Sequence, residues 1–344
     1  MELSARKLKI LSAVIDNYVR SAEPISSKLL CDLLGISVSS ATIRNELAEL
    51  TELGLLEQPH TSAGRIPSHR GYRLYINELM SRAHLPKKTR DYIDSELSLN
   101  SKDPDLILKN AATLLTNMTN FAVISTNVSA QRNSVRNIQL VQISAYTAML
   151  ILATSSGLIK NRVFRCEFLL TADVLQAISN ALNEKFAGVL LADITPAFIQ
   201  TAAVSLGEMA FLMSDVLGAL LEVARQASKT DFHFDGQTNL LLVPEFNQQA
   251  AIKLMNFFTY AEDISDLLLL PENNKTRVFI GQESQHEELA QSSVIVTRYV
   301  VNGGNYGSLG IVGPTRMNYS SVIASLEYVA SLLGAALNKL LSLE

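Results

Sequence analysis

The stretch SSATIRNELAELTELG, residues 39–54, decides how the N-terminal part of the chain folds. At about 100° per residue, Ile43, Leu47 and Leu50 fall within one narrow stripe of a helix, and the opposite side is small and polar. A helix that enters a DNA major groove needs short side chains and groups that pair with base edges, and there Asn45 suits adenine and Arg44 suits guanine. The alternative is an ordinary surface helix with a serine N-cap.

The residues before this stretch carry the signals of two more helices. Residues 4–20 place apolar side chains three and four positions apart, which predicts an amphipathic helix. A second, short helix is bounded by an N-cap at Ser26 and a left-handed C-cap at Gly35. Three residues separate Gly35 from Ser39, the tight turn of a helix-turn-helix. The apolar face of the second helix is expected to consist of Leu29, Leu30, Leu33 and Leu34.

A basic segment follows the residue 39–54 stretch. Leu55 and Leu56 are expected to begin a strand, whose return partner runs through Ile66 into Gly71-Tyr72-Arg73. Residues 60–90 hold seven Lys and Arg against one acid, Glu78, although the whole chain carries −4. Such a segment is typical of a surface that faces phosphates, with a solvated charged face as the alternative. Three helices and a hairpin in this order predict a winged helix-turn-helix.

Composition limits the remaining possibilities. With 344 residues, 48% of them hydrophobic, the chain is long enough for two or three domains. We find no apolar run long enough to span a bilayer and no signal core at the start, so we expect a cytoplasmic protein without a membrane partner. Cys31 and Cys166 lie far apart without ligand spacing, so neither a disulfide nor a metal site is expected, and both are expected to be buried.

Five motifs resemble the heat-inducible transcription repressor HrcA family of bacteria. They are PISSK (24–28), SATIRNE (40–46), HTSAGRIP (60–67) followed by GYR (71–73), GQTNLL (236–241) and GIVGPTRMNY (310–319). The resemblance covers the chain from end to end. It implies a repressor that binds an inverted repeat in double-stranded DNA, the CIRCE element ahead of chaperone operons, with GroE chaperonin as its partner.

Beyond the basic segment, the pattern predicts a polar linker and then a mixed α+β region. Pro86 and Pro104 punctuate the linker, and the head is expected to pivot there. Alternating residues predict an antiparallel meander at 121–126, 135–143, 146–154 and 158–166. Helical spacing returns over 172–228, before a strand-like run at 240–243 and a helix at 248–270. Further strands are expected at 276–281, 293–301 and 309–312, ahead of a long final helix.

A sheet that stops at Cys166 and resumes near Thr276 predicts one α+β domain with an insertion, and two consecutive domains are the alternative. The resemblance implies that this domain is GAF-like and that the mostly helical insertion makes a homodimer. The expected fold class is therefore α+β multidomain, with no cofactor implied. The expected parts are a winged helix-turn-helix domain (1–80), a linker (81–104), the first part of the GAF-like domain (105–166), an inserted dimerising domain (167–272) and the second part of the GAF-like domain (273–344).

Catalysis has little support in the sequence. The glycine-rich run at 303–310 resembles a phosphate loop, but it lacks the glycine order and precedes a strand, so a β-hairpin is preferred. His233 and His286 lie far apart, and no nucleophile elbow is present, so an enzyme is not expected. The alternative function is a metabolite-responsive winged-helix regulator with a ligand in the GAF-like domain, which a pocket of convergent polar groups would indicate.

The preferred function is a dimeric, sequence-specific transcriptional repressor of heat-shock operons. Arg44 and Asn45 are expected to read bases. Three hydroxyl side chains are expected to position the helix on phosphates: Ser39, Ser40 and Thr42. Contacts to the DNA backbone and minor groove are expected from His60, Thr61, Ser62, Arg65, Arg70 and Arg73.

Overall fold

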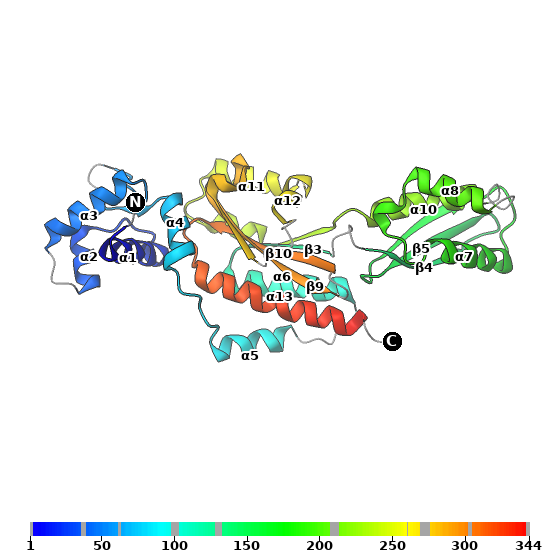
Figure 1. The fold of residues 1–344 in the computed structure, drawn as a ribbon, viewed down its shortest axis with the longest axis horizontal. Helices are drawn as coiled ribbons and strands as arrows, with labels where there is room; N and C mark the ends of the chain where they lie inside the picture. Colours follow the sequence, from blue (N-terminus) through cyan, green and yellow to red (C-terminus); the bar gives the residue numbers. More distant parts are fainter. Residues whose placement is uncertain are drawn as a thin grey trace.

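The chain forms three parts arranged in a row, which we call the head, the body and the insertion (Figure 1). The computed structural model describes residues 3–341, with gaps at 36–38, 61–62, 98–102, 128–132, 207–212, 260, 269–275 and 302–304. The head comprises residues 5–79, the body residues 104–126 and 232–341, and the insertion residues 135–227. Helix α5 (Lys87–Glu96) lies on the linker between the head and the body.

The head contains the three expected helices and a short hairpin. Ser26 and Ser39 cap α2 and α3 as predicted, because the hydroxyl of each accepts a hydrogen bond from the backbone N–H three residues later. Gly35 ends α2 with φ +57°, the left-handed conformation that glycine adopts without strain. The elements are α1 (Ala5–Ser21), α2 (Ser27–Leu34), α3 (Ser40–Glu52), β1 (Leu56–Glu57), β2 (Ile66–Pro67), α4 (His69–Leu74) and the π-helix η1 (Tyr75–Leu79).

Two local expectations for the head are wrong. The return strand ends at Pro67, and Gly71-Tyr72-Arg73 lies on α4, because Ser68 caps a new helix by accepting from the backbone N–H of Gly71. Of the four leucines on α2, Leu30 is fully buried and Leu34 is half-buried. Leu29 and Leu33 are exposed at 44% and 55%. The sequence pattern therefore predicted a wider apolar face on α2 than the face that packs against the rest of the head.

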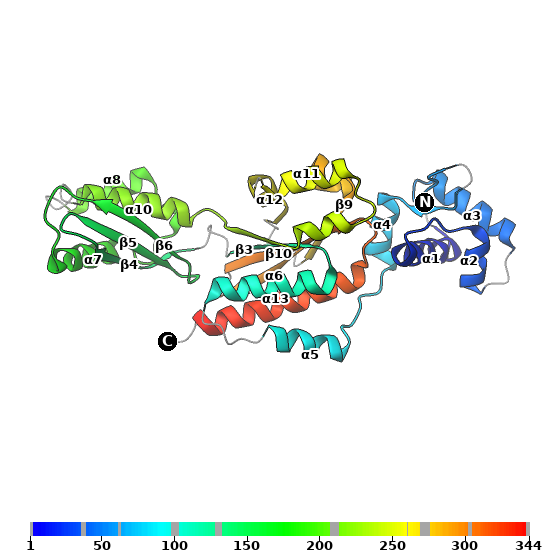
Figure 2. The same cartoon turned by 180° about the vertical axis from the view of Figure 1, so that it is seen from behind.

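The body is built on a five-stranded antiparallel sheet in the order β7-β3-β10-β9-β8. Helices α6 (Pro104–Thr119) and α13 (Tyr319–Leu341) lie along one face, and α11 (Gln248–Thr259) and α12 (Ala261–Leu268) lie over the other (Figures 1 and 2). The strands are β3 (Ala122–Thr126), β7 (Phe232–Asp235), β8 (Thr276–Ile280), β9 (Ser292–Val301) and β10 (Asn305–Pro314). Strands β9 and β10 pair as the expected hairpin, whose turn lies outside the described residues.

The insertion has a sheet and a core of its own. Strands β4 (Val135–Gln142), β5 (Thr147–Thr154) and β6 (Ile159–Arg165) pair only with one another among the described strands. Their buried side chains pack against α7 (Ala172–Phe186) and α10 (Ser214–Ala227). Helix α8 (Pro196–Leu206) and a 3-10 turn, η3 (Leu191–Asp193), complete this part.

The expected sheet, running on to Cys166 and resuming at Thr276, is therefore wrong. Alternation shows that each strand buries one face, but it does not show which strand or helix covers that face. Helices α11 and α12 lie over the body, because buried side chains such as Phe257 and Leu268 pack with its strands. The strand expected at 240–243 is also wrong, since Gln237–Leu242 forms the 3-10 helix η4 and the strand β7 precedes it.

Helix α13 also departs from the sequence expectation about membranes. It is long and apolar enough, by length and composition, to cross a bilayer. In the structure it packs against α6 and β9, and its side chains Leu326, Val329 and Leu333 are fully buried. The apolar stripe on α13 is thus part of the body core.

The head is docked on the body, and the pivot expected at the linker stays a prediction. One continuous core runs from α1 through α4 into α6, β9 and α13. The rings of Tyr72 and Tyr319 lie 5.8 Å apart, and burial raises the pKa of both phenols. The linker itself is fastened to α13, because the hydroxyl of Ser320 accepts from the backbone N–H of Ala83 at 2.9 Å, and that of Tyr328 donates to Asp94 at 2.9 Å.

Candidate nucleic-acid interface

The outward face of α3 carries the polar side chains expected to meet DNA. Ile43, Leu47 and Leu50 are buried against the rest of the head, as the 100° pattern predicts. Arg44 and Asn45 are both exposed on the opposite side and form no side-chain hydrogen bond with any residue that the structure describes. The exposed Ala41 has a small side chain, so the backbone of α3 can approach a surface closely.

The hydroxyl residues at the start of α3 cap this helix and contact α2. The Ser39 hydroxyl accepts from the backbone N–H of Thr42 and lies 2.9 Å from the Thr42 hydroxyl. The Ser40 hydroxyl lies 3.2 Å from the hydroxyl of Ser27 on α2. Both serines are exposed at the helix N-terminus, where the helix dipole and open backbone N–H groups favour an anion such as phosphate.

A buried carboxylate fixes α3 in position, and the sequence reasoning missed it. Glu46 is 6% exposed, and the guanidinium of Arg6 on α1 donates from Nε to its Oε1 at 2.8 Å. A second pair, between Lys7 and Glu49, spans the same two helices at 2.5 Å, and this hydrogen bond raises the pKa of Lys7. A signal was available, because Glu46 follows Ile43 by three positions and so falls within the apolar stripe.

The hairpin β1–β2 lies beside the C-terminal end of α3. Arg65 pairs through its backbone with Ile25, and its Nε donates to the hydroxyl of Thr51 on α3 at 3.0 Å. Gly64 is required here, because a Cβ atom at that position would lie 2.2 Å from the carbonyl oxygen of Ile25. His60 is exposed. Thr61 and Ser62, the expected tip residues, lie outside the described residues.

The two arginines on α4 lie in different environments. Arg70 is exposed. Arg73 is directed toward the body, where its guanidinium binds the carboxylate of Glu283 and donates to the carbonyl oxygen of Val278 at 2.7 Å. Desolvation opposes the ionised form of Glu283, but hydrogen bonds from Arg73 and from the backbone N–H of Ile280 outweigh it, so the pKa of Glu283 is lowered. The structure therefore does not bring Arg73 together with the other expected DNA contacts.

Cys31 and Cys166 form no disulfide. Cys166 is buried as expected, whereas Cys31 on α2 is half-buried. Among the described residues, no three His, Cys, Asp or Glu side chains gather as a metal site would require. Within the described residues, the exposed face of α3 with the adjacent hairpin is the surface that matches the sequence-based site.

Comparison with known proteins identifies the class of this chain. Residues 105–323 match the family model for the HrcA protein C terminal domain. The heat-inducible transcription repressor HrcA of Thermoanaerobacter pseudethanolicus is 36% identical, over 99% of this chain and 98% of that protein. The repressor of the same name from Ruminiclostridium cellulolyticum is 34% identical, over 99% of both chains. A crystal structure of a hypothetical protein shares the fold, with a TM-score of 0.65 at 22% identity over 98% of this chain and 100% of that one.

The mixed α and β fold and these relatives define a multidomain transcription repressor. Repressors act on DNA, which agrees with the position of the polar face of α3 on the head. The chain belongs to the HrcA family of heat-inducible transcription repressors.

Proposed function

We propose that this cytoplasmic repressor reads a CIRCE-type inverted repeat ahead of chaperone operons through a winged helix-turn-helix head. The observation that carries this proposal is the exposure of Arg44 and Asn45 on the outward face of α3, with Ile43 buried behind them. In the proposal these two side chains read base edges in the major groove, since Arg pairs with guanine and Asn with adenine. The start of α3 positions the helix on phosphates through Ser39, Ser40 and Thr42.

The hairpin β1–β2 is proposed as the wing. His60, Thr61, Ser62 and Arg65 would contact the DNA backbone and minor groove there, with Arg70 beside them. The contact between Arg65 and Thr51 supports this role, because it fixes the base of the hairpin against the reading helix. Arg73 is not assigned to DNA, because its guanidinium is bound to Glu283 and to the Val278 carbonyl.

Operator binding also requires two heads, because one reading helix covers only one half-site of a palindrome. We propose that the insertion provides the symmetric contact. The sheet face opposite α7 and α10 is mixed and no described helix covers it, and on it the apolar Val141, Ile159 and Val163 are exposed at 36%, 63% and 52%. Val141 and Val163 flank Met149 from the two neighbouring strands, so they lie on one face. The proposed interface is thus on residues 135–227, since α11 and α12 of the expected 167–272 segment pack on the body.

A deletion tests the proposed interface. Thr126 and Phe232 are paired across β3 and β7, so a short turn that joins them can replace residues 127–231 while leaving the body strands in place. We expect this variant to sediment as a monomer and to bind a palindromic operator weakly. The point variant Val163→Asp tests the same surface in the full chain. A deletion protein that remains a dimer would place the interface elsewhere.

Modulation by GroE chaperonin is proposed from the family resemblance. The head and body meet through several separate contacts, and apparent operator affinity scales with the fraction of molecules in which all of them have formed. A footprint on a chaperone promoter tests both parts of the proposal. Addition of GroE and nucleotide is expected to raise the active fraction without changing the affinity of competent molecules. Full activity without chaperonin, with loss of binding on warming alone, would favour an intrinsic thermosensor.

The alternative, a metabolite-responsive regulator with a ligand in a GAF-like body, gains no support from the sheet face beneath α11 and α12. Buried Phe246, Phe257, Phe258 and Phe279 pack together there. A metabolite site would need several polar groups that converge on an open space, and these rings are apolar and in contact with their neighbours.

A further inference from the structure

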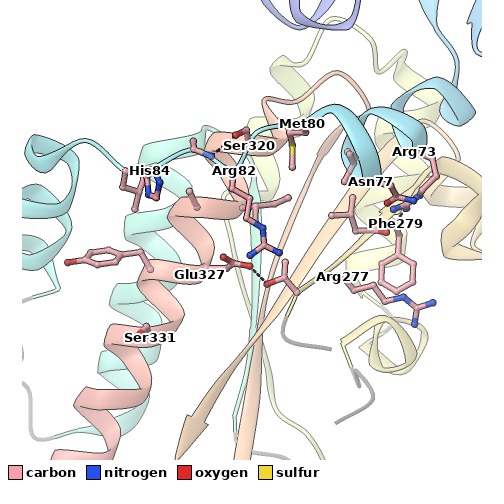
Figure 3. A pocket seen from close by; sticks show the side chains of 18 of the residues that line it. Arg73, Asn77, Met80, Arg82, His84, Arg277, Phe279, Ser320, Glu327 and Ser331 are labelled. Carbon is pink, nitrogen blue, oxygen red and sulfur yellow. Dashed lines mark hydrogen bonds between the residues drawn. The ribbon is translucent and has the colours of Figure 1, made fainter. Parts of the chain in front are cut away.

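A groove with a volume of about 1280 Å³ lies where the head, the linker and the body meet (Figure 3). One wall is the π-helix η1 and the linker that follows it. The other walls are strand β8, at the edge of the body sheet, and helix α13. Its apolar lining includes Ile76 and Met80 from η1 and its end, and Ile323 from α13. The groove is therefore lined by residues of the head, the linker and the body together.

The groove is cationic. Arg82 and Arg90 from the linker and Arg277 from β8 are exposed and form no salt bridge with any residue that the structure describes. Figure 3 shows the guanidinium of Arg82 directed into the groove toward Glu327, and Arg277 beside the ring of Phe279, with a guanidinium carbon 4.7 Å from the ring centroid. Arg277 lies with Phe279 on the face of β8 that α11 and α12 cover, whereas Arg82 lies on the face toward α13, so the arginines border the groove from both sides of this edge strand.

The acidic residues of the groove are already engaged. Glu283 is bound by Arg73, and Glu327 accepts a hydrogen bond from the Thr276 hydroxyl at 2.6 Å. Among the described residues, Arg82, Arg90 and Arg277 thus line the groove without a carboxylate partner, against the one remaining negative charge of Glu327. A ligand that carries carboxylates is the electrostatic complement of such a surface, because guanidinium and carboxylate groups pair through two parallel hydrogen bonds.

The shape of the groove distinguishes between anionic partners. Small-molecule sites measure roughly 300–1,000 Å³, so this groove suits a longer ligand. The groove is concave and partly apolar. A surface that binds the phosphates of a DNA duplex projects from the protein, so the shape of the groove does not favour DNA. Addition of a strand to β8 is blocked, because Arg73 occupies the Val278 carbonyl and Glu283 occupies the Ile280 N–H. The remaining candidate ligand is an extended peptide that lies across the groove.

We propose that this groove binds an extended acidic peptide of a partner protein, with an apolar side chain between its carboxylates. Carboxylates of the peptide pair with Arg82 and Arg90 on one side of the β8 edge and with Arg277 on the other, and the apolar side chain lies against Ile76 and Ile323. A peptide in this position contacts the linker, β8 and α13 together. Its binding therefore stabilises the docked arrangement of head and body over any arrangement in which they separate.

Fluorescence anisotropy with the full-length protein tests the proposal. The probe is a labelled decapeptide of alternating Glu and Ala with one central Leu, and the comparison probe has Lys in place of Glu. The double variant Arg82→Glu/Arg277→Glu is expected to weaken binding of the acidic probe about tenfold, and the Gln double variant less. Added salt is expected to weaken it further. The matched control is Arg225→Glu, an exposed charge reversal on α10 of the insertion.

Four outcomes overturn the proposal. The first is equal binding of both probes, and the second is equal affinity in the Arg82→Glu/Arg277→Glu and Arg225→Glu variants. The third is the absence of wild-type binding at millimolar probe. The fourth is a selective loss of random-duplex binding in the double variant when the peptide does not bind. The last result would assign these arginines to DNA phosphates. Thermal unfolding of each variant verifies that the exposed substitutions leave the fold intact.

Discussion

The outward face of α3 and the inward face of α4 belong to the same small head but differ in their partners. Arg44 and Asn45 on α3 are exposed and make no side-chain hydrogen bond among the described residues. Tyr72 and Arg73 on α4 are held by Tyr319 and Glu283 of the body. Both faces come from the N-terminal segment that the sequence assigns to DNA. The difference teaches that positive charge alone does not predict that an arginine binds phosphate, because the guanidinium can instead bind an acceptor within the same chain.

The largest expected effect comes from removing the Tyr72 ring from the inward face of α4. Tyr72→Ala removes a ring that is 1% exposed between head and body, and it is expected to lower the free energy of unfolding by about 3–5 kcal/mol. Urea denaturation measures this change. Tyr72→Phe is the matched control, because the Tyr72 hydroxyl is buried without a hydrogen-bond partner among the described residues. Its loss should be neutral or stabilising, and a large cost for Tyr72→Phe would show that the hydroxyl is satisfied.

Substitutions on the outward face of α3 are expected to change the affinity for DNA and not the free energy of unfolding. Asn45→Ala should weaken operator binding by about 1–3 kcal/mol and leave random-duplex binding nearly unchanged, since it removes a base contact. Arg65→Ala should weaken both, because a phosphate contact carries no sequence information. Anisotropy titrations at fixed salt measure the two affinities. Equal losses on both DNAs in Asn45→Ala would show that Asn45 does not face the base edges.

A smaller effect is expected at the ion pair behind α3. Arg6→Ala leaves the carboxylate of Glu46 buried without its cation, at a cost of about 1–2 kcal/mol for a pair whose arginine is half exposed. Chemical denaturation and operator affinity should fall together, since α3 is then less firmly held. Lys7→Ala is the control, because its partner Glu49 is exposed and little change is expected. Equal effects of the two variants would argue against a special role for the buried carboxylate.

The smallest expected effect is at the Arg73–Glu283 pair, where pH separates charge from packing. Glu283→Gln should destabilise the protein at neutral pH by up to about 1 kcal/mol, as partly exposed pairs do. The folded-state pKa of Glu283 lies below its ordinary 4.5, so its contribution is fully present above that value and lost as pH falls below it. Wild type and variant should therefore converge in acid. A difference that persists there would come from packing and not from charge.

Sequence reasoning succeeded where the signal is local. The serine caps, the left-handed Gly35 and the apolar stripe of α3 depend on residues within a few positions of each other. They determine helix α3 almost completely. Glu46 was within reach of the same arithmetic, but its partner Arg6 lies on another helix. A pattern on one helix can show that a carboxylate is misplaced, although it cannot show which cation compensates it.

Sequence reasoning failed where the decisive partner is distant. Arg73 and Glu283 are separated by 210 positions, so nothing near either residue indicates their contact. The strands β4, β5 and β6 were found by alternation, but their membership of a second sheet depends on pairing across the whole chain. Helix α4 lies where a strand was expected, because the Ser68 hydroxyl caps a helix that begins at His69. These errors moved domain boundaries and left the polar face of α3 unaffected.

The position of β3 between β7 and β10 has a consequence for synthesis on the ribosome. Strand β3 leaves the exit tunnel early, but both of its neighbours in the sheet follow the insertion, and β10 comes near the end of the chain. The insertion can form its sheet from consecutive hairpins as soon as it emerges, since local pairing is fast. The body must wait for its last strands. Until β7 and then β10 have emerged, Ile124 and the rest of β3 have unpaired edges, the kind of segment that chaperones shield from aggregation.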